Sequence, residues 1–204
     1  MLYTASKFFR SPPFCGAVIV PAEIMQKLQA DQTAVVPHGL KTFVGQSELP
    51  DDLTIWRNQL DSSINHGLAL RWEAGLAEIE QTLKIEESIR LEHEQLWRNE
   101  VIAELEKYDN LNYFSAANDT TSIVSIRIKS TKEGKEWFNK GELVHVFKAM
   151  TQNRGEQFPD STVLASRKCF IGQPVVISPT EAVLRIALGS DSLRAYIAAK
   201  AQTI

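Results

Sequence analysis

Apolar residues recur every three or four positions between residues 67 and 108, and this spacing predicts the longest helical stretch of the chain. The periodic positions are Leu68, Trp72, Leu76, Ile79 and Leu83, followed in looser register by Ile89, Leu96, Ile102 and Leu105. Glutamates fill the other faces of this stretch. Because the run is long for a single globular helix, we expect a break between Thr82 and Glu87.

The first 66 residues carry fewer regular patterns. The apolar run from Gly16 to Val20, closed by Pro21, predicts a short buried strand. A short helix is expected over residues 22–29. Residues 37–66 are rich in proline, glycine and aspartate, so we expect mostly loop there.

The remainder of the chain alternates between predicted strands and helices. Residues 110–121 are polar and predict a linker, and the period of two over residues 122–129 predicts a half-buried strand. Further strands are expected from residue 162, over 173–177 and over 182–189, and helices over 140–153 and 192–201, the last capped by Ser190 or Asp191. This order predicts an α/β fold with a small, largely antiparallel sheet and helices on one face.

Composition excludes several functional classes. The chain has 204 residues, of which 44% are hydrophobic and 23% charged, as in ordinary soluble globular proteins. Its net charge of -3 favours no nucleic-acid partner, and no apolar run is long enough to cross a membrane. Cys15 and Cys169 lie far apart without metal-ligand spacing, so we expect a reduced, cytoplasmic protein without a metal site.

Lys7 is the first candidate for chemistry. It directly precedes Phe8 and Phe9, and Phe14 follows the rigid turn expected at Pro12-Pro13. A lysine held against these rings would be partly desolvated, which disfavours the charged ammonium and suits a lysine that condenses with an aldehyde. The alternative is a surface lysine beside a core strand.

The segment SKFFRSPPFCGAVIVP resembles the one that carries the cofactor lysine in class-V-aminotransferase-like proteins, which are fold type I transferases dependent on pyridoxal 5'-phosphate. This resemblance implies that Lys7 is the catalytic lysine and that an amino acid is the substrate. In such enzymes the phosphate loop, the ring-stacking residue and the aspartate on the pyridine nitrogen precede this lysine. We therefore expect the C-terminal part of such an enzyme, inactive alone and binding the cofactor weakly or not at all.

Arg185 is the second candidate. A guanidinium binds a carboxylate through two hydrogen bonds and keeps its charge, so an arginine inside an apolar strand favours an anionic partner. The alternative is a residue on a solvent-facing side of the strand. The sequence VLRIALG resembles the strand whose arginine binds the substrate carboxylate in fold type I enzymes, which implies that role for Arg185.

Cys169 is a weaker candidate, as a nucleophile. The segment RKCFIGQPVVI is similar to one in the same family, and cysteine desulfurases place a nucleophilic cysteine upstream of the carboxylate arginine. The neighbouring Arg167 and Lys168 would favour the thiolate. The alternative is a small buried residue, because Phe170 and Ile171 beside it are expected to be buried.

Resemblance at both ends implies two parts: residues 1–66, a remnant of the large cofactor domain, and residues 67–204, an interdomain helix plus the small C-terminal α/β domain. NHGLALRWEAGLAEI is similar to the interdomain stretch of some members. The family association implies a homodimer or an upstream partner chain. Two alternatives remain open, namely a non-catalytic dimerisation or interaction module derived from such an enzyme, and a cysteine desulfurase-like enzyme.

Overall fold

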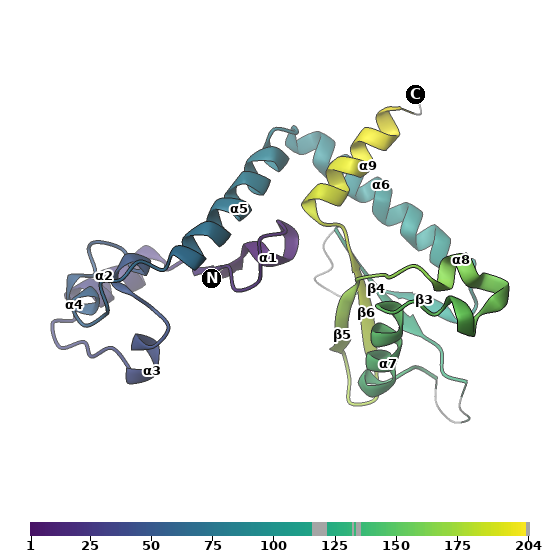
Figure 1. Ribbon diagram of the computed structural model, residues 1–204, viewed down its shortest axis with the longest axis horizontal. Coiled ribbons are helices and arrows are strands. Elements are labelled where there is room, and N and C mark those ends of the chain that lie inside the picture. Colours follow the sequence, from purple (N-terminus) through teal and green to yellow (C-terminus); the bar gives the residue numbers. More distant parts are fainter. Residues whose placement is uncertain (116–121, 132, 134–135, 203–204) are drawn as a thin grey trace. The chain divides into compact units, whose positions relative to one another are not determined.

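The computed structural model describes residues 1–115, 122–131, 133 and 136–202 (Figure 1). The chain is mixed α/β and divides into two compact units, residues 1–84 and 85–204, here called the N-terminal and C-terminal units. The division falls between two long helices, α5 (His66–Leu83) and α6 (Glu87–Leu105). The break predicted between Thr82 and Glu87 is therefore confirmed.

The N-terminal unit is mostly helical. Its elements are β1 (Leu2–Thr4), α1 (Ala5–Phe8), β2 (Gly16–Val18), α2 (Ala22–Ala30), α3 (His38–Lys41), the 3-10 turn η1 (Gln46–Glu48), α4 (Thr54–Arg57) and α5. The strand predicted over residues 16–20 and the helix predicted over 22–29 are present. The predicted burial of the strand is wrong, because β2 pairs only with β1 in a two-stranded antiparallel sheet and is exposed along its length.

Close packing joins α1 to α5, as Figure 1 shows. Gly75 on α5 allows this approach, since a Cβ atom there would lie 2.9 Å from the Cβ of Ala5. The loop after α1 is tied to the same helix, because the Ser11 hydroxyl donates a hydrogen bond to the Arg71 carbonyl at 2.7 Å. The segment that carries Lys7 is thus fixed on one face of α5.

The C-terminal unit contains the main sheet. Its elements after α6 are β3 (Leu111–Phe114), β4 (Ile123–Ile128), α7 (Lys140–Met150), η2 (Gly155–Gln157), η3 (Pro159–Ser161), α8 (Thr162–Ala165), β5 (Gly172–Val176), β6 (Ala182–Ala187) and α9 (Ser190–Ala201). The four strands are antiparallel in the order β3-β4-β6-β5. The predicted small antiparallel sheet is confirmed.

Three predictions of local structure are wrong in this unit. Residues 162–165 form a helical turn instead of a strand, because the Thr162 hydroxyl bonds back to the Pro159 carbonyl at 2.9 Å. The predicted linker 110–121 contains strand β3, while its residues 116–121 lie outside the described part. The last helix is preceded by Gly189 at its N-cap and includes Ser190 and Asp191, which were expected to cap it.

Helices α6 and α7 cover the same face of the sheet. Ile126 on β4 and Leu184 on β6 are register partners, so their side chains share one face. Ile126 packs in a cluster with Leu105 of α6, and Leu184 packs in a cluster with Leu143 of α7. Alternation places the intervening residues of the strands, including Arg185, on the opposite face.

Candidate functional site

Lys7 lies on the four-residue helix α1, whose N-cap Thr4 accepts a hydrogen bond from the Ser6 amide at 3.4 Å. The Lys7 side chain is exposed, and Phe14 is 89% exposed. Phe8 and Phe9 contact each other edge to face, with ring centroids 5.1 Å apart. The predicted desolvation of Lys7 by these rings is therefore wrong for this unit as described.

The surroundings of Lys7 were tested against the needs of pyridoxal 5'-phosphate. A phosphate site requires donors that are free to bind it, yet the buried hydroxyls of this unit are already engaged. Ser11 donates to the Arg71 carbonyl at 2.7 Å, and Thr82 donates to the Glu78 carbonyl at 2.9 Å. With its amine in solvent and its buried hydroxyls bonded, this unit does not by itself fit the cofactor.

Arg185 lies on the sheet face opposite α6 and α7, called the open face here because neither helix covers it, although Ser125 and Val183 on it are buried. It lies on β6, directly opposite Ser125 of β4 on one side and Gly172 of β5 on the other. Its side chain is partly buried, and it has no hydrogen-bond or ionic partner among the described residues. A partly buried guanidinium without a partner is able to receive an anion.

A second arginine, Arg127 of β4, belongs to the same face but is already engaged. Its guanidinium carbon lies 4.3 Å from the Trp137 ring centroid and 5.2 Å from that of Phe114. It donates to the Asn112 side-chain oxygen at 2.9 Å and pairs with Glu181 at 3.9 Å. Sequence reasoning missed this arrangement, although the period of two in β4 already placed Arg127 and Ser125 on one side.

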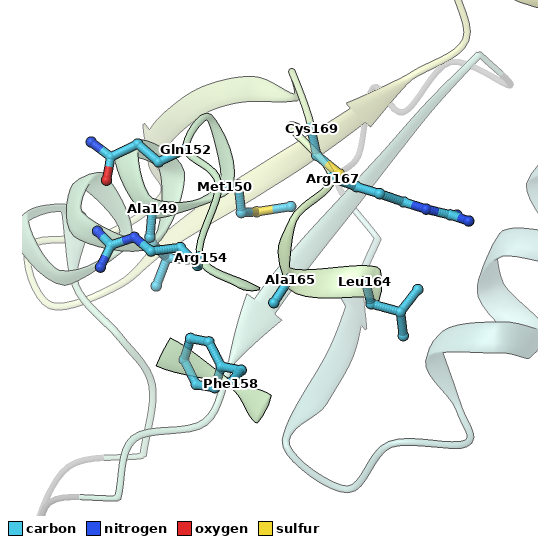
Figure 2. A pocket seen from close by; sticks show the side chains of 10 residues that line it. Ala149, Met150, Gln152, Arg154, Phe158, Leu164, Ala165, Arg167 and Cys169 are labelled. Carbon is cyan, nitrogen blue, oxygen red and sulfur yellow. The ribbon is translucent and has the colours of Figure 1, made fainter. Parts of the chain in front are cut away.

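Cys169 lines a pocket of about 330 Å³ beside the last turn of α7 (Figure 2). Its backbone amide donates to the Met150 carbonyl at 2.7 Å, which ties the loop to α7. In Figure 2 the side chains of Arg154 and Arg167 extend in opposite directions at the two ends of this pocket. The predicted burial beside Cys169 is wrong, because Cys169 is exposed and Phe170 is 81% exposed.

Cys169 and Arg185 do not share a site within the C-terminal unit. Cys169 lines a pocket beside α7, whereas Arg185 is on the face that α7 does not cover. This arrangement adds no support to the desulfurase alternative. Lys7 belongs to the N-terminal unit and Arg185 to the C-terminal unit.

Among the residues that the structure describes, no three His, Cys, Asp or Glu side chains are grouped to hold a metal ion. In the same residues, none of the helices combines the length and the apolar character needed to cross a membrane. Comparison with protein-family models, curated proteins and solved structures gives no significant match.

Proposed function

We propose that this chain is the C-terminal part of a pyridoxal 5'-phosphate-dependent, class-V-aminotransferase-like enzyme that acts on an amino acid. Arg185 binds the carboxylate of the substrate, and Lys7 binds the cofactor. Protein outside the described residues supplies the phosphate and ring contacts that the N-terminal unit lacks. The observation that carries this proposal is the unpartnered guanidinium of Arg185 on the open face of the sheet.

The surroundings of Arg185 leave its guanidinium available to a ligand. Removing a guanidinium from water is unfavourable unless hydrogen bonds or an anion replace the lost hydration. Arg127, on the same face, obtains part of that replacement from Asn112, Glu181 and two aromatic rings, while its Nε is buried without a partner. Arg185 has no such partner among the described residues, and none of its nitrogens is among the fully buried side-chain atoms without a partner, so its guanidinium is accessible to a carboxylate.

The test is to express the chain together with the protein encoded directly upstream of it and to purify the assembly with the cofactor. A visible absorption band of bound cofactor is expected in the assembly and should be weak in the chain alone. Lys7→Ala should abolish the band. Lys27→Ala, which changes another exposed lysine of the same unit, is the matched control and should keep it. A band that persists in Lys7→Ala, or its absence from the assembly, would refute the proposal.

A second candidate function, a non-catalytic interaction module, is favoured by the apolar surface of the two-stranded sheet β1-β2 in the N-terminal unit. Leu2 and Val18 are register partners in β1 and β2, and both are more than half exposed. A stable cofactor-free homodimer that Val18→Ser dissociates would support this function. Leu70→Ser, at an exposed leucine of α5, is the control that should leave the dimer intact. Sedimentation of the three proteins at matched concentrations distinguishes these outcomes.

A further inference from the structure

One row of residues crosses the whole sheet on its open face. Phe114 of β3, Ser125 of β4, Arg185 of β6 and Gly172 of β5 are successive register partners. Adjacent strands are about 4.8 Å apart, so Ser125 and Gly172 are the nearest cross-strand neighbours of Arg185 on this face. Any ligand held flat on the sheet by Arg185 therefore contacts this row.

Ser125 is the unusual member of the row. It is only 4% exposed, and its hydroxyl has no hydrogen-bond partner among the described residues. Its oxygen is not among the fully buried side-chain atoms without a partner, so a ligand on this face can reach the hydroxyl. A hydroxyl directly opposite an unpartnered guanidinium supplies the second donor that a carboxylate oxygen requires.

Gly172 allows β5 to approach Arg185 closely on the side away from Ser125. A Cβ atom at this position would lie 3.0 Å from the Arg185 carbonyl oxygen and 3.2 Å from the Arg185 Cβ. A side chain there would press against the β6 backbone and occupy the surface next to the guanidinium. The glycine thus lets β5 lie against Arg185, and any larger residue there would displace Arg185 or the β5 strand.

The charges on this face restrict the class of ligand. Arg127 pairs with Glu181 and donates from one nitrogen to Asn112, while its Nε is buried without a partner and out of a ligand's reach. Arg185 is therefore the accessible, unpartnered guanidinium of the described part of this face. A second carboxylate on the ligand would find no free cation in the row. The ring of Phe114, beyond Ser125, offers apolar contact instead.

We propose that Arg185, Ser125 and Gly172 form a subsite for a monocarboxylate with an uncharged, apolar tail that extends over Ser125 toward Phe114. This inference rests on the carboxylate-binding role of Arg185 given above and adds the substrate class. It requires no bound cofactor. The subsite belongs entirely to the C-terminal unit, so it can be tested apart from Lys7.

The test is a titration of the full chain, labelled with ¹⁵N at its arginines, with 3-phenylpropanoate and, separately, with glutarate. The side-chain Nε–H signal of Arg185 should shift and saturate with 3-phenylpropanoate, while that of Arg127 moves little. Glutarate, which replaces the apolar tail with a second carboxylate, should bind at least several-fold more weakly. Saturable binding of both acids with equal affinity would overturn the assigned class.

Substitutions separate the members of the subsite. Ser125→Ala should weaken 3-phenylpropanoate binding by about 5-fold, the usual effect of losing one hydrogen bond. Ser125→Thr, which keeps the hydroxyl, should retain most of the affinity. Gly172→Ala should weaken binding as well, and Ser192→Ala, at an exposed serine of α9, should have no effect.

Three outcomes would overturn the inference. If Ser125→Ala binds 3-phenylpropanoate as the unchanged chain does, Ser125 is not a ligand contact and the subsite is wrong. Loss of binding in Arg185→Lys would in that case still support the role of Arg185. If neither substitution changes the titration, both the subsite and the role of Arg185 fail. A chain whose Arg185 signal never saturates with 3-phenylpropanoate contradicts the subsite, whatever the cofactor experiment on Lys7 gives.

Discussion

Gly75 is the position where one added methyl group should displace the segment that carries Lys7. It is buried in the middle of α5, and its absent side chain is what lets α1 approach. A Cβ atom there would lie 2.9 Å from the Ala5 Cβ and 3.3 Å from the Ser11 Cβ. Ala5 is fully buried and its Cβ is attached directly to the α1 backbone, so α1 itself must move.

Two opposing effects set the magnitude for Gly75→Ala. Replacing glycine by alanine inside a helix stabilises it by about 1 kcal/mol. Overpacking a close contact costs about 1–3 kcal/mol. Gly67→Ala, in the same helix, is the matched control, because its Cβ would meet the flexible end of Arg71 at 2.9 Å and Asn65 Oδ1 at an ordinary 3.6 Å. We therefore expect Gly75→Ala to be less stable than Gly67→Ala by about 1–3 kcal/mol.

Urea unfolding of both variants measures the free energy of unfolding. Hydrogen exchange locates the change, since the Ser11 amide donates to the Ala5 carbonyl and should exchange faster in Gly75→Ala. If Gly75→Ala stabilises the chain as much as Gly67→Ala does, and Ser11 stays protected, the close contact between α1 and α5 does not exist as described.

Two further predictions concern the C-terminal unit. Leu143→Ala should lower the free energy of unfolding by about 2–5 kcal/mol, because Leu143 is fully buried under the sheet. Leu164→Ala, at a 68% exposed leucine, should change it by less than about 0.5 kcal/mol. Equal effects of the two substitutions in urea unfolding would contradict this core. Hydrogen bonds from Lys200 and Tyr196 lower the pKa of Glu100 below that of an ordinary carboxyl group. The ionised Glu100 therefore stabilises the α6–α9 contact fully above the ordinary carboxyl pKa, and this stabilisation is lost as the pH falls through the lowered pKa of Glu100. Glu100→Gln should therefore be less stable than the unchanged chain at neutral pH, and melting temperatures should converge in acid; a gap independent of pH would refute this assignment.

Long elements with strong periodicity were predictable from the sequence. The helical stretch with its break and strand β6 all follow from the spacing of apolar residues. Short segments were not predictable, since four residues such as Thr162 to Ala165 suit a strand or a helical turn equally. There the side-chain bond of Thr162 to the preceding turn decides the structure.

Some residues of the candidate site were predictable from the sequence and others were not. Arg185 could be identified because an arginine interrupts an apolar strand, and its unpartnered state is consistent with that interpretation. Ser125 could not be identified, because its burial and its position opposite Arg185 depend on the register of two strands distant in sequence. The exposure of Lys7 was equally out of reach, because which rings cover a side chain is a tertiary property.

Helix α5 links these observations to the proposed function. It buries Gly75 and Thr82, which are seven residues apart and share one face, while Leu76 and Leu83 form a second stripe that is mostly exposed. Gly75 and Thr82 are covered within the N-terminal unit, whereas the two leucines beside them are not. This unit therefore has exposed apolar surface on α5, as expected if Lys7 belongs to a site that other polypeptide completes.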